Sequence, residues 1–140
     1  MDSYRHVADL RRRLDDALAG GCRIGFVPTM GALHSGHLNL IERSVAENSF
    51  TVVSIYVNPT QFNNPNDLST YPRQPEKDLA LLRSAGCDAV FFPSDEVMYP
   101  EGVKCHHYDL GVLDSVIEGK HRPGHFQGVA TVVDHLFRLV

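Results

Sequence analysis

The sequence has few cysteines and no long apolar run, and both absences exclude classes of protein. Its three cysteines, Cys22, Cys87 and Cys105, lie far apart and form no C-x-x-C pair. That spacing argues against a disulfide framework and against a zinc knuckle. No segment approaches the roughly 18 apolar residues of a membrane-spanning helix, and no apolar secretion signal follows the first residues. We therefore predict a cytoplasmic protein without a membrane partner.

The two best-known glycine-rich phosphate-binding motifs are also missing. The chain contains neither G-x-G-x-x-G nor G-x-x-x-x-G-K-[ST], so a nucleotide site would need another motif. The net charge of -4 argues against nucleic acid as a partner. The one basic run, Arg11–Arg13, falls within a predicted amphipathic helix, where a solvent-exposed face is its expected role.

Helix-like and strand-like segments alternate along most of the chain, whose 140 residues are enough for one domain. The predicted helices span residues 3–19, 35–47, 76–85 and 128–140. The predicted strands span residues 23–28, 51–57 and 88–92. Residues 61–75 are expected to form a loop. Residues 94–123 are expected to mix short helical turns with a helix near 112–119, and a strand near 105–110 is left open.

The apolar strands show no polar alternation, which is typical of a parallel sheet covered on both faces. The sequence therefore predicts an α/β fold with right-handed crossovers. Ligands of such sheets bind beyond the carboxyl ends of the strands, where His34, His37 and Asn58 fall.

His34 and His37 open a predicted helix directly after a buried strand. Helix N-termini attract phosphate, and two imidazoles there add further donors. Alternatively, the two histidines could simply pack a loop. They could also bind zinc, but the pair lacks a third ligand at the usual spacing. The pairs His106/His107 and His121/His125 are also poor zinc motifs, so we predict no metal ligands in this chain.

Five ordered blocks of sequence cover essentially the whole chain and carry a resemblance. They are P-T-M-G-A-L-H with Gly36 and His37; V-N-P-T-Q-F; Y-P-R with Asp78; Pro93 with M-Y-P; and Glu118-Gly119 with R-P-G-H-F and G-V-A-T-V-V. In these blocks the chain resembles the pantothenate synthetase family, nucleotidyltransferases with an H-x-G-H signature. Tyr56 replaces a phenylalanine that is common in the family.

The resemblance implies a Rossmann-like nucleotidyltransferase fold and a ligase reaction. The carboxylate of pantoate attacks the α-phosphate of ATP and gives a pantoyl adenylate and pyrophosphate. The amine of β-alanine then displaces AMP and forms pantothenate, a precursor of coenzyme A. The implied partners are ATP as substrate, Mg²⁺, pantoate, β-alanine and a second copy of the chain in a homodimer.

The resemblance also implies roles for individual residues. His34 and His37 are the expected catalytic residues, because they would donate to the phosphates of ATP. Met30, Asp78 and backbone N–H groups near Met30 would complete the ATP site. Pantoate would contact Met30, Asn58, Gln61, Phe62, Val132 and Val133. Phosphate or loop contacts are expected for Glu118, Arg122 and His125.

Each of these roles has a structural alternative. Asn58 is suited to a turn, Gln61 to an ordinary loop and Asp78 to the first turn of a helix. The apolar residues expected to contact pantoate could equally belong to a core. Glu118 and Arg122 could form a surface salt bridge.

Family members continue beyond the last matching block into a loop with lysine, aspartate and glutamine and then a smaller C-terminal domain. We therefore expect residues 1–140 to be an incomplete N-terminal nucleotide- and pantoate-binding domain, truncated before this lid. The fragment alone is expected to be inactive. It is also expected to self-associate near its second strand or last helix. The alternatives are a substrate-binding or self-associating fragment without catalysis, and a related adenylyltransferase.

Overall fold

A computed structural model describes residues 1–116 and 118–140, apart from the side chains of Asp114 and Glu118. The chain divides into two compact units. We call residues 1–56 and 72–94, together with Val140, the sheet unit, and residues 57–71 and 95–139 the helical unit.

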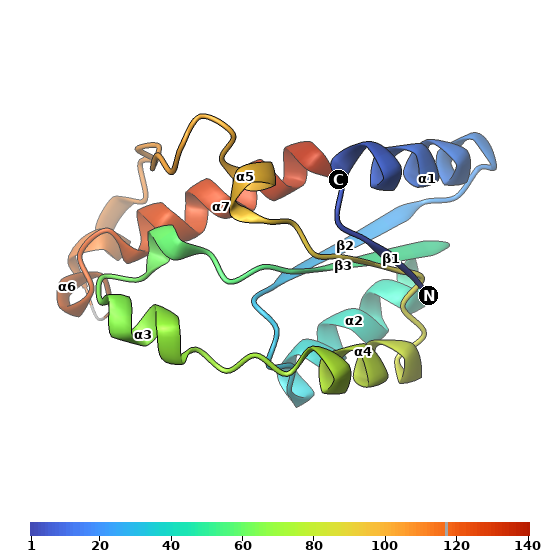
Figure 1. Ribbon diagram of the computed structural model, residues 1–140, viewed down its shortest axis with the longest axis horizontal. Helices are drawn as coiled ribbons and strands as arrows, with labels where there is room; N and C mark the ends of the chain where they lie inside the picture. Colours follow the sequence, from blue (N-terminus) through green and yellow to red (C-terminus); the bar gives the residue numbers. More distant parts are fainter. Residues whose placement is uncertain (117) are drawn as a thin grey trace. The chain divides into compact units, whose positions relative to one another are not determined.

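The sheet unit is a four-stranded parallel sheet with helices on both faces (Figure 1). Its strands are β1 (Asp2–Tyr4), β2 (Ile24–Thr29), β3 (Phe50–Ile55) and β4 (Ala89–Phe91), in the spatial order β1-β4-β3-β2. Helices α2 (Ser35–Glu47) and α4 (Pro75–Ser84) lie on one face, and α1 (Val7–Ala19) lies on the other. The predicted α/β fold with a parallel sheet is confirmed.

The core between the sheet and helices α2 and α4 is built from aliphatic side chains. Val27, Val53 and Val90 come from three neighbouring strands and pack against Ile41 of α2 and Leu82 of α4. Burial of each such side chain contributes about 1.5–3 kcal/mol. This core fixes where α2 begins relative to the carboxyl end of β2.

The neighbouring strands β2 and β3 differ in burial. Nearly all of β3 is buried, as expected for a strand covered on both faces. In β2 the buried residues Gly25, Val27 and Thr29 alternate with half-buried ones, so burial on both faces was wrong for this strand. The reason is position, because β2 stands at one end of the described strand order.

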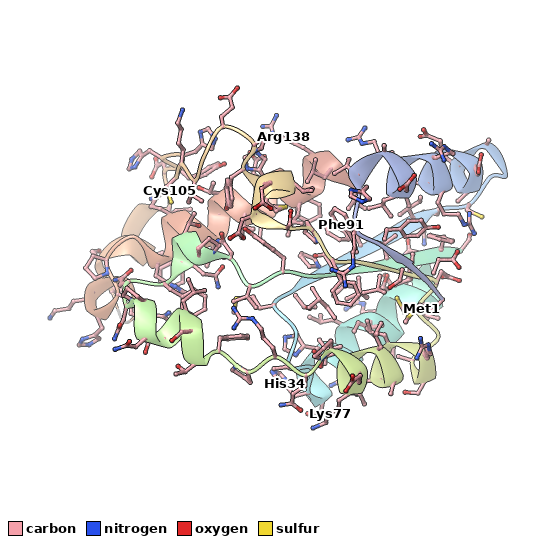
Figure 2. All side chains as sticks on the ribbon, viewed as in Figure 1. Met1, His34, Lys77, Phe91, Cys105 and Arg138 are labelled. Carbon is pink, nitrogen blue, oxygen red and sulfur yellow. The ribbon has the colours of Figure 1, made fainter. Side chains whose placement is uncertain are left out.

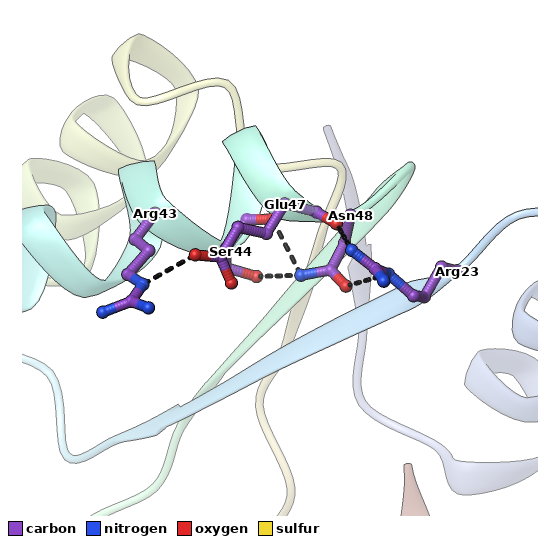
Figure 3. Close-up of polar contacts among 5 residues, drawn as sticks. All are labelled: Arg23, Arg43, Ser44, Glu47 and Asn48. Atoms are coloured by element: carbon purple, nitrogen blue, oxygen red, sulfur yellow. Dashed lines mark hydrogen bonds and ion pairs between the residues drawn. The ribbon is translucent and has the colours of Figure 1, made fainter.

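Polar contacts anchor the far end of α2 (Figure 3). The Arg23 guanidinium donates to Asn48 Oδ1 at 3.1 Å and to the carbonyl of Glu47. Asn48 in turn donates to the Ser44 carbonyl at 2.9 Å. A cation at the C-terminus of a helix also interacts favourably with the helix dipole. Gly25 leaves room for this network, since a Cβ there would overlap the side chains of Ser44 and Asn48.

The helical unit is built around its longest helix, α7 (His125–Leu139). Its other elements are η1 (Pro59–Gln61), α3 (Pro65–Thr70), α5 (Asp95–Met98), η2 (Gly111–Ser115) and α6 (Glu118–His121). The buried side of α7 carries Thr131, Val132 and Leu136. Phe137 of the same helix is 59% exposed.

Two segments differ from the predicted secondary structure because each contains a short element that was not predicted. Residues 2–4 form β1 and not the start of a helix, since Ser3 pairs with Val90 in a parallel ladder. The expected loop 61–75 contains α3, whose start has an Asn64 side chain that accepts the Asn66 N–H at 2.9 Å and proline at the first position. Asparagine followed by proline is a standard helix start, which the interpretation as a loop missed.

The segment 102–110 has no regular secondary structure, so the strand left open near 105–110 is absent. A side chain takes the place of a neighbouring strand: Gln127 accepts the Tyr108 N–H at 2.8 Å and donates to the Tyr108 carbonyl at 2.9 Å. The helix expected near 112–119 is instead η2 and α6, and Ile117 lies outside the described residues. Among the described helices, none is long and apolar enough to cross a membrane.

Candidate active site

The chain turns sharply between the end of β2 and the start of α2. Thr29 is buried there, and its Oγ1 donates to the Ser54 carbonyl at 2.8 Å and accepts the Gly31 N–H at 3.1 Å. Gly31 and Ala32 then have φ angles of 78° and 51°. Glycine adopts this left-handed region freely, whereas alanine does so only when its surroundings hold it there.

Asp78 of α4 provides that restraint. Its Oδ2 accepts the Ala32 N–H at 2.9 Å, and its Oδ1 accepts the Leu33 N–H at 2.8 Å. The residue is only 2% exposed, and hydrogen bonds to a carboxylate are stronger than neutral ones. The starts of α2 and α4 consequently lie together, as the labels of His34 and Lys77 show in Figure 2. Asp78 therefore positions the turn, and the ATP contact expected for it stays a prediction.

His34 and His37 cap the start of α2 with their own rings. His34 is the N-cap residue, and its Nδ1 accepts the Gly36 N–H at 3.1 Å. The His37 Nδ1 accepts the His34 N–H at 3.3 Å, which completes a reciprocal capping box. The two ring centroids lie 4.0 Å apart. The sequence thus brings the two predicted catalytic histidines into direct contact.

The caps determine which ring nitrogen carries the hydrogen. Because each Nδ1 accepts a backbone N–H, each neutral ring holds its own hydrogen on Nε2. Burial, and then the proximity of His34, lower the pKa of His37, while Asp78 opposes this shift. His37 is therefore neutral at neutral pH. The pair offers two Nε2–H donors at the end of β2, where a phosphate would interact favourably with the helix dipole.

Most backbone N–H groups of this segment bond within the protein. Their acceptors are Thr29 for Gly31, Asp78 for Ala32 and Leu33, and the two histidine rings for His34 and Gly36. Few of the backbone N–H groups near Met30 are therefore left to bind a nucleotide. The imidazoles are the better candidates.

A second cluster of site residues lies in the helical unit, where Asn58 has no exposed surface. Its Nδ2 donates to Thr60 Oγ1 at 2.7 Å, to the Gly128 carbonyl at 3.1 Å and to Gln61 Oε1 at 3.2 Å. Its Oδ1 accepts the Tyr99 hydroxyl at 2.8 Å and the Thr60 N–H at 3.3 Å. Asn58 therefore organises the loop that carries Gln61, and its contact with pantoate stays a prediction.

Gln61 is 6% exposed, and its backbone is held from the start of α7. Its carbonyl oxygen is 2.9 Å from the His125 Nδ1 and accepts from the Arg122 guanidinium at 3.5 Å. Of the two roles expected for Arg122 and His125, the structure thus displays the loop contact. The phosphate contact stays a prediction.

The remaining predicted site residues are Met30, Phe62, Val132, Val133 and Glu118. Met30 is half-buried in the sheet unit, and the other four belong to the helical unit. Val132 is buried and Val133 half-buried on α7, while the Phe62 ring meets Tyr71 edge-on at 5.7 Å. The side chain of Glu118 lies outside the described residues.

The side chains that the structure describes supply no ligand set for a metal ion. Within residues 1–116 and 118–140, no group of three histidine, cysteine, aspartate or glutamate side chains has the required arrangement. Both oxygens of Asp78 already accept backbone N–H groups. The described residues therefore offer no set of three protein ligands for Mg²⁺.

Comparison with known proteins identifies the family. The model of the pantoate-beta-alanine ligase family matches residues 2–140. The chain belongs to this family. It is 54% identical over 140 residues to the pantothenate synthetase of Porphyromonas gingivalis, covering 100% of this chain and 50% of that protein. It is 48% identical over 140 residues to the pantothenate synthetase of Cytophaga hutchinsonii, covering 100% of this chain and 49% of that protein.

Solved structures of this ligase family have the same fold. The pantoate-beta-alanine ligase of Francisella tularensis, complexed with beta-gamma ATP and beta-alanine, matches with a TM-score of 0.90 and 44% identity. That match covers 99% of this chain and 53% of the other. The pantothenate synthetase of Thermus thermophilus matches with a TM-score of 0.85 and 49% identity over 100% of this chain and 49% of its own. The chain thus spans about half the length of the family members it matches.

Sequence reasoning missed residues that hold the predicted site residues in place. Thr29 and Tyr99 were noted only as parts of matching blocks. Their signal was weak, because a strand-end threonine and a tyrosine between methionine and proline have many ordinary roles. Gly128 was also missed, although a glycine in the first turns of a helix often marks a close backbone approach.

Proposed function

We propose that this chain supplies the nucleotide- and pantoate-binding part of an ATP-dependent ligase that condenses pantoate with β-alanine. Membership of the pantoate-beta-alanine ligase family supports the reaction class. The observation that carries the proposal is the reciprocal capping of His34 and His37, which leaves the two Nε2 atoms as candidate donors at the end of β2.

In the first step, a carboxylate oxygen of pantoate attacks the α-phosphorus of ATP. The bond between the α-phosphorus and the bridging oxygen breaks, and pyrophosphate leaves with the electron pair. His34 and His37 donate hydrogen bonds to phosphate oxygens whose charge rises in the transition state. Such preorganised donors accelerate reactions because they need no rearrangement when the charge develops.

In the second step, the amine of β-alanine attacks the acyl carbon of pantoyl adenylate, and AMP leaves. Gln61 is the proposed anchor for pantoate, since a primary amide suits both a carboxylate and a hydroxyl group. Val132, Val133 and Phe62 of the helical unit are proposed to contact its gem-dimethyl group. The family implies Mg²⁺, and the described residues contain no group of three side chains that would hold it, so no step here depends on a metal held by them.

Two further proposals concern the assembled protein. The matched relatives are about twice as long as this chain, so we propose that residues 1–140 alone have no appreciable synthetase activity. We also propose that the chain forms a homodimer in the cytoplasm. A clean monomer in sedimentation at high concentration would overturn the dimer.

A related adenylyltransferase, which keeps the nucleotide in its product, is the second candidate. Gln61 argues against it, since an amide inside a buried polar cluster suits a small hydroxy acid better than a second phosphate. The released product distinguishes the two reactions. AMP that depends on pantoate and β-alanine supports the ligase, whereas an adenylylated product supports the alternative.

The decisive experiment measures single-turnover release of pyrophosphate from ATP and pantoate. It compares a longer version, which carries the C-terminal region of the family, with its His34→Ala and His37→Ala variants. We expect each variant to lose about 10²–10³-fold in rate while its affinity for pantoate changes little. Normal release in both variants would assign the histidines to packing alone.

A further inference from the structure

Tyr99 and Gln61 bind the same side-chain amide. The Tyr99 hydroxyl lies 2.8 Å from Asn58 Oδ1, and Gln61 Oε1 lies 3.2 Å from Asn58 Nδ2. All three residues are buried, at 5%, 6% and 0% exposure for Tyr99, Gln61 and Asn58. No function proposed above makes use of Tyr99.

Two backbone groups determine the orientation of the Asn58 amide. The Thr60 N–H can only donate, so the atom 3.3 Å from it is the Asn58 oxygen. The Gly128 carbonyl can only accept, so the atom 3.1 Å from it is the Asn58 nitrogen. Reversal of the amide would set donor against donor and acceptor against acceptor.

This orientation fixes the two neighbouring side chains. The Tyr99 hydroxyl must donate to Asn58, because it meets the oxygen. Gln61 must present its own oxygen to the Asn58 nitrogen. The Gln61 amide is therefore held in one orientation, with its oxygen toward Asn58.

We propose that Tyr99 is a positioning residue, which acts through Asn58 to fix the orientation of the Gln61 amide for the binding of pantoate. The pantoate part of this inference rests on the proposed function. The orientation of the amides does not, because it follows from hydrogen bonds within the helical unit.

The surroundings of Tyr99 suit this role. Its ring meets His135 of α7 edge-on, with centroids 5.5 Å apart and planes at 86°. Its N–H donates to the Asp95 carbonyl at 2.7 Å, so the backbone is fixed as well. Burial raises the pKa of its hydroxyl above the ordinary value of 10.0. The phenol therefore stays protonated, and remains a donor, throughout the neutral range.

The test compares Tyr99→Phe with Tyr108→Phe in the full chain. Tyr108 is a matched control, because its hydroxyl also donates to a side-chain oxygen, that of Asp134 at 3.1 Å, away from Asn58. Hydrogen exchange of the side-chain amide protons of Asn58 and Gln61 is followed by NMR. We expect exchange to accelerate about 10-fold or more in Tyr99→Phe and to stay unchanged in Tyr108→Phe.

Calorimetric titration with pantoate supplies the functional readout. We expect the dissociation constant to rise about 10-fold in Tyr99→Phe, the factor that corresponds to one hydrogen bond. Asn58→Asp is a second variant with a sharper prediction. A carboxylate at position 58 can only accept, so it would reverse the Gln61 amide, and pantoate binding should fall further.

The outcomes separate the two proposals. If the parent chain binds no pantoate, the proposed ligand is wrong, while the exchange experiment still decides the role of Tyr99. If the parent binds pantoate and Tyr99→Phe matches it in affinity and exchange, Tyr99 does not position Gln61. Should Tyr99→Phe fail to fold, Asn58→Asp with unchanged pantoate affinity would overturn the inference.

Discussion

The rings of His34 and His37 cap the same helix reciprocally, with the His34 N–H bound to His37 Nδ1 and the Gly36 N–H bound to His34 Nδ1. Capping boxes usually pair a hydroxyl with a carboxylate or an amide. Here the capping groups are also the proposed phosphate donors. One set of hydrogen bonds therefore stabilises the helix start, selects the tautomer of each ring and places both Nε2 atoms.

The first prediction concerns pH and the cap. The pKa of His37 lies below its ordinary value of 6.5 in the folded chain, so the unfolded chain takes up this proton first as pH falls. The contribution of His37 to stability is therefore complete above pH 6.5 and is lost as pH falls through the lowered pKa. Protonation also removes the Nδ1 acceptor and breaks the cap.

Chemical unfolding between about pH 7 and 5 measures this loss, with His37→Gln as the matched variant. Glutamine at the third helical position keeps an acceptor for the His34 N–H but does not titrate. We expect the variant to lose less stability over this range than the parent. An NMR titration that finds the pKa of His37 at or above its ordinary value would contradict the argument.

The second prediction concerns Asp78. Asp78→Asn keeps one oxygen but places an NH₂ group against either the Ala32 or the Leu33 N–H. We expect a loss of about 1–3 kcal/mol in the free energy of unfolding. The pKa of His37 should fall further, because the charge of Asp78 raises it.

Asp88→Asn is the control for that experiment. Asp88 accepts a single backbone N–H, from Thr51 at 2.8 Å, which the oxygen of an asparagine can still accept. We expect a smaller loss of stability and no change at His37. Equal effects of the two variants would show that Asp78 is an ordinary buried acid and not a specific clamp on the turn.

How well the sequence predicted an element depended on the length of its apolar pattern. Elements with long apolar patterns, such as α2 and β3, were predicted well because many apolar side chains recur at the spacing of one element type. Ser35–Glu47 has the predicted bounds. The short strand β1 was not predicted, since its three residues are ordered by pairing with β4, a contact that no local pattern records.

The site residues also differ in how well the sequence predicted them. Among the residues that would touch substrates, His34 stands out because it opens a helix directly after a buried strand, and Gln61 because it falls in a block that resembles the family. The residues that orient them do so through backbone groups and distant partners. Tyr99 reaches Asn58 from 41 positions along the chain, and only the fold brings them together.

The third prediction concerns close packing at Gly128. A Cβ on this residue would lie 2.5 Å from the Thr60 carbonyl oxygen and 2.9 Å from the Gln61 backbone nitrogen. Because both are backbone atoms, α7 and η1 would have to separate. Gly128→Ala should destabilise the chain by about 1–3 kcal/mol and should weaken pantoate binding together with the Asn58 contact.

Thermal and chemical unfolding test this prediction against Gly20→Ala. At Gly20 an added Cβ meets nothing closer than the Ala17 carbonyl oxygen at 3.4 Å, which is ordinary contact. The control should change stability little. If the two alanine variants unfold alike, the helical unit accommodates a methyl group at Gly128 and the close approach has no energetic importance.

The last prediction concerns Cys87, which is 4% exposed. Its thiol donates to the Ala89 carbonyl at 3.1 Å, and burial raises its pKa from 9.0 to about 11. Since the thiolate is the reactive form, native Cys87 should resist iodoacetamide at pH 8, whereas exposed Cys105 should react.

Between pH 9.0 and about 11 the Cys87 thiol ionises in the unfolded chain but not in the folded one, so folding stability falls as pH rises. This loss amounts to at most about 3 kcal/mol, and Cys87→Ala should remove it while Cys105→Ala should not. Alkylation followed by peptide mass analysis tests the first part, and unfolding at pH 8 and 10.5 tests the second. Rapid native labelling of Cys87 would mean that the core beside β4 opens readily to solvent.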